Sequence, residues 1–134
     1  MGAWDVGIWD NDDAADWGGD LADTDGIDLL RDSLTPSEVK GCYLEAPEGV
    51  RILCVADTLR AALDLGKATV PDEVSTWVKE HANLDYRSLV PNALAKLRRV
   101  LAEHSELHEL WKENEELYPR WREQVEALAQ SLGR

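Results

Sequence analysis

The most apolar stretch of the chain is PEGVRILCVADTLRAALDL, residues 47–65. Pro47 suits the first turn of a helix, because the N–H that proline lacks would have no partner there. Gly66 suits the position just after a helix end. Apolar residues fall on nearly every side of this predicted helix, so we expect it at the centre of a helical bundle.

Shorter amphipathic segments flank this helix on both sides. Apolar spacings of three and four, together with capping and turn residues, predict helices over residues 12–23, 25–34, 71–81, 89–101, 106–117 and 119–132. Asn11, Ser88 and Ser105 are the expected N-caps, and Thr24 or Asp25 is expected to cap the second helix. Residues 1–10 are expected to form an extended arm, and a short strand near residues 42–44 has no evident partner strand.

The length fits one domain, residues 1–134, which is long enough to bury a core without metals or disulfides. The prediction is therefore an all-α, single-domain bundle of about six to seven short helices with a Trp-bearing N-terminal arm. Cys42 and Cys54 lack the spacing of a zinc or redox site. Two free thiols are favoured over a disulfide between them.

Negative charge is concentrated at the start of the chain. The net charge is −13, and the first 32 residues hold ten Asp against one Arg, a net charge of −9. Such a field repels phosphate backbones and anionic lipids, so nucleic-acid and membrane binding are not expected, whereas a basic protein partner is favoured. No apolar run reaches about 18 residues and no signal peptide is recognisable, which predicts a cytoplasmic protein.

Carboxylates in this acidic region are the first candidate site. Asp10, Asp12, Asp13 and Asp16 offer the oxygen ligands that Mg²⁺ or Ca²⁺ prefers, although the spacing is not that of an EF-hand. The alternative is that Asn11, Asp12 and Asp13 only cap a helix and complement its dipole. Apart from a divalent cation, no cofactor is predicted.

His104 and His108 are a second candidate metal site, because their spacing of four would place both on one face of a helix. Glu106 does not occupy the position that the HExxH motif requires, and no third ligand follows. Ordinary surface histidines are therefore favoured over a zinc site.

Tryptophan and one aspartate in the apolar helix complete the candidates. The chain has six Trp and no Phe. Trp4 and Trp9, in the arm, are expected either to dock the arm on the bundle or, together with Asp16 and Asp20, to contact a partner. Asp57, three residues before Arg60 in the apolar helix, is interpreted as half of a structural ion pair rather than as a catalytic group.

Residues 4–17, WDVGIWDNDDAADW, resemble the N-terminal signature of a family of small uncharacterised bacterial proteins, Trp-Gly-x-Gly-x-Phe-Asp-Asn-Asp-x-Ala-x-Asp. Residues 43–48, YLEAPE, and 105–111, SELHELW, are similar to the same family. Asp5 stands where the signature has Gly, and Trp9 where it has Phe. The resemblance implies a bacterial, actinobacterial-like, cytoplasmic protein with a domain of unknown function, and it implies no activity.

No phosphate-binding Gly-rich loop and no G-x-S-x-G elbow occurs in the chain. The leading hypothesis is therefore a non-enzymatic interaction protein, inhibitor-like or immunity-like, that presents its acidic N-terminal region to a basic partner. The alternative is a divalent-metal-binding protein or metal-dependent enzyme that uses the Asp cluster. Monomer and homodimer both remain open.

Overall fold

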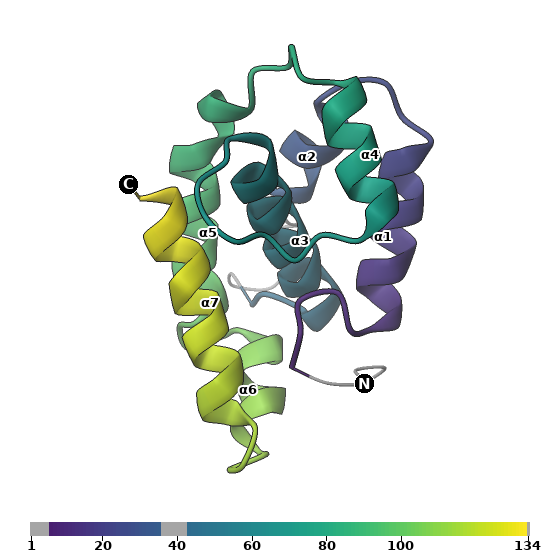
Figure 1. Ribbon diagram of the computed structural model, residues 1–134. Coiled ribbons are helices and arrows are strands. Elements are labelled where there is room, and N and C mark those ends of the chain that lie inside the picture. Colours follow the sequence, from purple (N-terminus) through teal and green to yellow (C-terminus); the bar gives the residue numbers. More distant parts are fainter. Residues whose placement is uncertain (1–5, 36–42, 134) are drawn as a thin grey trace.

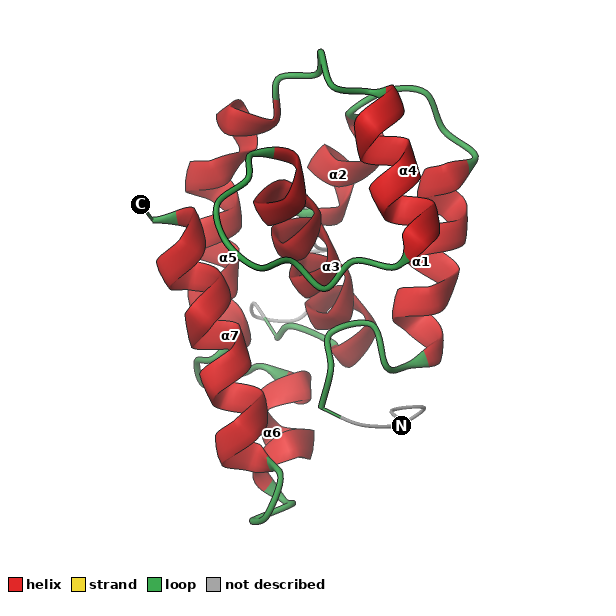
Figure 2. Ribbon diagram, viewed as in Figure 1, coloured by secondary structure: helices red, strands yellow, loops and turns green. Residues whose placement is uncertain are grey.

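The computed structural model describes residues 6–35 and 43–133. This part of the chain is all-α, as predicted (Figures 1 and 2). It holds α1 (Asp12–Ala22), α2 (Asp28–Ser33), α3 (Ala46–Ala62), α4 (Asp72–Glu80), the 3-10 turn η1 (Tyr86–Leu89), α5 (Val90–Val100), α6 (Glu106–Lys112) and α7 (Tyr118–Leu132).

The central helix is α3, as its apolar sequence predicts. All residues from Ile52 to Arg60 are buried, and α3 contacts every other helix described. In Figure 1, α1 and α4 lie on one side of α3 and α5 and α7 on the other. Because α3 is enclosed by its neighbours, it can be apolar all round, whereas each outer helix buries only one face.

The end of α3 differs from the prediction that placed the stop at Gly66. The helix ends at Ala62, and Asp64 takes the left-handed conformation at φ 52°. The N–H of Asp64 donates to the carbonyl of Ala61 and the N–H of Leu65 to that of Arg60, which is a Schellman ending. An Asp in this role is less readily recognised from sequence than Gly, because most residues avoid positive φ.

Two predicted caps are also wrong. α2 begins only at Asp28 with Ile27 at the N-cap position and no side-chain cap, so Thr24 and Asp25 both precede the capping position. The carbonyl of Thr24 instead accepts the indole N–H of Trp77 at 2.7 Å. Before α5 the capping residue is Asp85, whose carboxylate accepts the N–H of Ser88 at 3.3 Å and starts η1.

The caps at Asn11 and Ser105 are confirmed, but α6 stops at Lys112 rather than near residue 117. Its side chains also support a neighbour, since the carboxylate of Glu106 accepts the N–H of Ala46 at the start of α3, at 2.7 Å. The strand considered at residues 42–44 is, within the described residues, one isolated parallel bridge between Leu44 and Ser105. No helix in the described residues is long and apolar enough to cross a membrane.

Candidate functional site

Residues 6–11 form what we call the N-terminal turn. The sequence predicted an extended arm, but the N–H of Asp10 donates to the carbonyl of Gly7 at 3.1 Å, and Ile8 is only 3 % exposed. A Cβ on Gly7 would collide with the carboxylate of Asp10, so a larger residue at this position would require that side chain to move. Burying Ile8 favours a turn folded onto the bundle over an arm in solvent.

Trp9 docks this turn on α3. Its indole N–H donates to Oδ2 of Asp57 at 2.9 Å. The same oxygen accepts the N–H and the hydroxyl of Thr69, and Oδ1 accepts two N–H groups of Arg60 at 2.8 and 3.0 Å. Asp57 is fully buried, so five hydrogen bonds are what make its charge tolerable there. The predicted ion pair with Arg60 is therefore present, and the candidate arm residue Trp9 joins it.

A second contact, from Gln124 on α7, also holds the N-terminal turn on the bundle. The side-chain amide of Gln124 donates to the carbonyl of Val6 and accepts the N–H of Ile8 at 3.2 Å. This amide thus pairs with the backbone as a neighbouring strand would, and it satisfies two polar groups beside the buried Ile8.

The third contact is made by Asn11, which is the N-cap of α1, as predicted. Its Oδ1 accepts the N–H of Ala14 at 2.8 Å, and its Nδ2 donates to the carbonyl of Ile8 at 3.3 Å. Asn11 therefore couples the N-terminal turn to α1, and its role is accounted for by structure alone.

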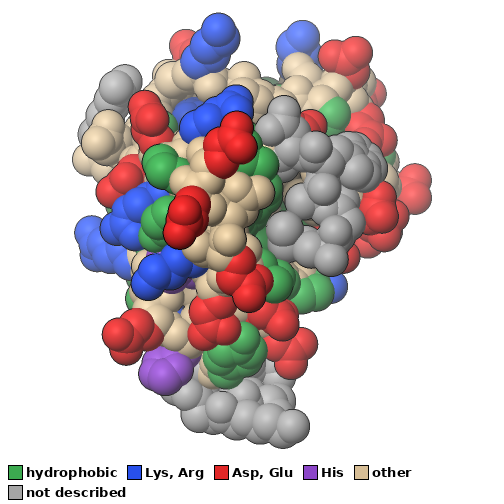
Figure 3. Space-filling view, turned by 90° about the horizontal axis from the view of Figure 1, so that it is seen from below, with side chains coloured by type: hydrophobic (Ala, Val, Ile, Leu, Met, Phe, Trp, Pro, Cys, Tyr) green, Lys and Arg blue, Asp and Glu red, His purple; other side chains and the backbone are tan. Residues whose placement is uncertain are grey.

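The outer side of α1, together with its C-cap residue Asp23, carries what we call the α1 acidic face: Asp12, Asp13, Asp16, Asp20 and Asp23. All five are exposed, whereas Ala14, Trp17 and Leu21 on the opposite side are buried. Within the described residues none of the five forms an ion pair. Figure 3 shows Asp and Glu side chains gathered at this edge of the molecule and Lys and Arg side chains at the opposite edge.

The candidate metal ligands do not converge in the part of the chain that the structure describes. No group of three His, Cys, Asp or Glu side chains lies close enough there to hold an ion. Asp10 is half-buried beside Gly7, and Asp12, Asp13 and Asp16 are exposed residues of a single helix. The divalent-cation hypothesis thus gains no geometric support and stays a prediction.

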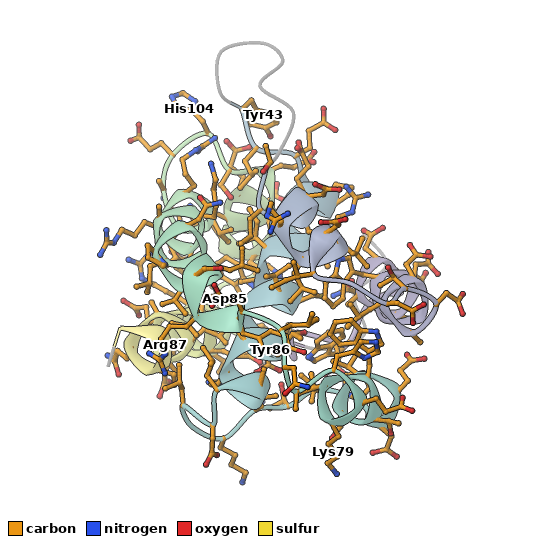
Figure 4. The ribbon with its side chains drawn as sticks, turned by 90° about the horizontal axis from the view of Figure 1, so that it is seen from above. Tyr43, Lys79, Asp85, Tyr86, Arg87 and His104 are labelled. Carbon is orange, nitrogen blue, oxygen red and sulfur yellow. The ribbon has the colours of Figure 1, made fainter. Side chains whose placement is uncertain are left out.

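The two histidines do not share a helical face, contrary to the prediction. His104 precedes α6, has φ 66° and is exposed, because Ser105 rather than His104 begins the capped turn. Figure 4 shows it at the rim of the molecule near Tyr43. His108 lies inside α6 with Nε2 2.6 Å from the hydroxyl oxygen of Tyr118. Burial, then the charges of Arg122 and Lys112, lower the pKa of His108 below its usual 6.5.

One small pocket lies beneath the N-terminal turn. The turn, the start of α3, and Leu107, Trp111 and Trp121 line it, and it encloses about 30 Å³. The two indole rings stack with centroids 6.2 Å apart. A space of this size accommodates a water molecule or two rather than an organic substrate.

The chain is similar to one known family over most of its length. The sequence pattern of one family, described as a domain of unknown function (DUF4259), matches residues 2–124. The chain belongs to this family. The resemblance noted in the sequence is thereby confirmed at the level of the family, which supplies no activity. No curated protein and no solved structure matches the chain.

Some residues that shape this DUF4259 member were missed by sequence reasoning. Gln124 holds the N-terminal turn through a contact across 116 residues of sequence. Thr69 binds Asp57, the acceptor of the Trp9 bond, across 12 residues, and nothing local to either residue indicates these contacts. Of the candidates, Trp4 and Cys42 lie outside the described residues. Cys54 is fully buried with its pKa raised by burial, as expected of an unreactive structural thiol.

Proposed function

We propose that this protein is a non-enzymatic interaction module, inhibitor-like or immunity-like, that binds a basic protein partner through the α1 acidic face. The observation that carries the proposal is the set of five exposed carboxylates along α1 and at its C-cap, none of which forms an ion pair with the residues that the structure describes. Capping and the helix dipole account for Asp12 and Asp13 in the first turn. They do not account for Asp16, Asp20 and Asp23.

The packing of α1 adds support for this proposal. Like charges four residues apart on a helix repel one another, so Asp12, Asp16 and Asp20 weaken α1 slightly. The buried side of the helix compensates, since Trp17 donates its indole N–H to the hydroxyl of Ser33 at 2.9 Å and Leu21 is fully buried. A rigid helix that carries unpaired charge is suited to fast, salt-dependent association with a basic surface.

Trp9 does not belong to this proposed surface, because its indole N–H is already bound to Asp57. Asp16 and Asp20 are its central residues. The proposed surface is thus a charged helix face, for which we expect association to depend strongly on ionic strength.

The test is affinity capture from native lysate with three baits. The first is the native chain, the second carries Asp12→Asn, Asp16→Asn and Asp20→Asn, and the third is a matched control with Glu113, Glu115 and Glu116 changed to Gln. These three Glu residues are also exposed but lie between α6 and α7. We expect a basic protein that the native chain and the control retain, that the second bait loses, and that salt elutes. Retention by all three baits, or indifference to salt, would count against the proposal.

The same variants separate this proposal from the divalent-cation hypothesis. A bound cation stabilises the folded chain in proportion to the logarithm of its concentration. A rise in Tm with Mg²⁺, Ca²⁺ or Zn²⁺ that EDTA reverses, present in the native chain and lost in the Asp→Asn variant, would favour the cation. An unchanged Tm in every condition would contradict the divalent-cation hypothesis.

A further inference from the structure

The chain has three tyrosines, and their hydroxyl groups lie in three different settings. Tyr43 donates to the carboxylate of Glu109 at 3.2 Å, and desolvation together with this bond raises its pKa. Tyr86 is buried, donates to the carbonyl of His81 at 2.8 Å, and has its pKa raised by burial to about 12. Figure 4 shows these two tyrosines well apart, Tyr86 inside the fold and Tyr43 near the rim.

The hydroxyl of Tyr118 is bound by a base and a cation instead. Its oxygen lies 2.6 Å from Nε2 of His108 on α6, and it accepts an N–H of Arg122, one turn further along α7, at 2.9 Å. Because Arg122 supplies the proton for its own bond, the phenolic proton of Tyr118 is free to point at His108. The neutral form of His108 at pH 7 can accept it.

Neighbouring rings hold this arrangement in place. The ring of His108 packs against those of Tyr118 and Trp121, with centroids 5.4 and 6.2 Å away. Arg122 is also paired with Glu126, at 3.7 Å. A nucleophile within hydrogen-bond reach of a fixed base is the arrangement that activates a hydroxyl group.

We propose that Tyr118 is the reactive tyrosine of this protein, a site of covalent modification by electrophilic acyl donors. The phenolic oxygen attacks the carbonyl carbon of the donor while the O–H proton passes to Nε2 of His108. The bond from the carbonyl carbon to the leaving group then breaks. The leaving group takes the proton from His108, and the products are the O-acyl ester of Tyr118 and the protonated leaving group. Arg122 stabilises negative charge on the oxygen as it develops.

Solvent accessibility and general-base assistance predict opposite orders of reactivity for Tyr43 and Tyr118. The proposal can therefore be tested on the native chain. The hydroxyl of Tyr43 takes part in an exposed hydrogen bond and that of Tyr118 in a partly buried one, so accessibility alone favours Tyr43. The experiment treats the full chain with N-acetylimidazole at pH 7.5 and follows acetylation of each tyrosine by peptide mass spectrometry. We expect Tyr118 to react at least about tenfold faster than Tyr43, because general-base assistance contributes roughly 10²–10⁴-fold.

Two further readouts identify the base. The rate at Tyr118 should be level around neutral pH and fall in acid, where His108 becomes protonated, whereas an unassisted phenol reacts tenfold faster with each pH unit. His108→Gln retains an acceptor without basicity, and it should slow Tyr118 about tenfold or more while leaving Tyr43 unchanged. Faster labelling of Tyr43 than of Tyr118 in the native chain, or a rate at Tyr118 that simply follows hydroxide, overturns the proposal without recourse to any variant.

Discussion

The indole N–H of Trp9 donates to Oδ2 of Asp57 at 2.9 Å, and this bond joins the N-terminal turn to the buried centre of α3. The two residues are 48 positions apart in the chain. The acidic N-terminal region is therefore not a charged tail: its first residues described here are bound to the most buried helix of the bundle.

Trp9→Phe retains an aromatic ring but removes this donor. Bonds to charged groups contribute about 1.5–3 kcal/mol, and Oδ2 of Asp57 keeps its two bonds from Thr69, so we expect a loss of about 1–2 kcal/mol in the free energy of unfolding. Urea denaturation measures it. A change below about 0.3 kcal/mol would mean that the bond has no energetic role in solution.

Asp57→Asn should lower the free energy of unfolding much more than Trp9→Phe does. It removes the charge that compensates Arg60, whose side chain is itself buried, and breaking such a pair from one side costs about 3–5 kcal/mol. Urea denaturation of the variant should give a correspondingly lower midpoint, with binding of a basic partner reduced only to the extent that the chain unfolds.

The double variant Asp57→Leu with Arg60→Met is the control for this prediction. Since replacing both members of a buried pair avoids an uncompensated charge, we expect it to recover more than half of the loss. A double variant as unstable as Asp57→Asn would show that the hydrogen bonds from Trp9 and Thr69, rather than the charge of Arg60, dominate at this position.

Sequence reasoning was most successful where the physics is local. The apolar run around Cys54, the cap at Asn11 and the cap at Ser105 each depend on residues within one or two turns. Docking of Trp9 on the bundle was one of the two alternatives predicted, and it is confirmed. The folded shape of the N-terminal turn and its partners, Asp57 and Gln124, were not predicted, because these partners are distant in sequence. The ion pair of Asp57 with Arg60 could be predicted, because the two residues are three positions apart in one helix. The bond from Trp9 to Asp57 could not.

In the candidate site, too, local features could be predicted and features that depend on distant residues could not. The exposure of Asp16 and Asp20 could be anticipated from their spacing relative to Trp17 and Leu21. The environment of His108 could not be anticipated, because Tyr118 on the next helix creates it. The spacing of four between His104 and His108 does not place them on one helical face, because His104 lies outside α6. Helix ends are set by small differences between competing caps, which a periodic pattern does not resolve.

Gln124→Leu should loosen the N-terminal turn specifically. It removes both bonds to the backbone of Val6 and Ile8, so we expect faster amide hydrogen exchange at Ile8 and a loss of about 1 kcal/mol in the free energy of unfolding. Gln130→Leu is the matched control, because Gln130 is exposed on the same helix. Equal exchange at Ile8 in both variants would contradict the role given to Gln124.

Substitutions at Asn11 separate its two bonds. Asn11→Ala loses the cap of α1 and should cost about 1 kcal/mol. Asn11→Asp keeps an acceptor for the N–H of Ala14 but loses the donor to the carbonyl of Ile8, so it should be the milder change. Urea denaturation ranks the two variants. If Asp were as costly as Ala, the bond to Ile8 rather than the cap would be the important one.

His108 gives the folded chain a defined pH dependence. Burial and the charges of Arg122 and Lys112 lower its pKa in the folded state below the value of 6.5 expected when unfolded. The folded state thus prefers neutral His108, and the stability that this preference contributes is fully present above pH 6.5. It is lost as pH falls below 6.5 toward the folded-state pKa, because the unfolded chain binds the proton more readily. Urea midpoints between pH 5 and pH 8 should therefore fall toward acid for the native chain. The decrease should be shallower for His108→Gln, and an identical slope in the two proteins would assign the pH dependence to other groups.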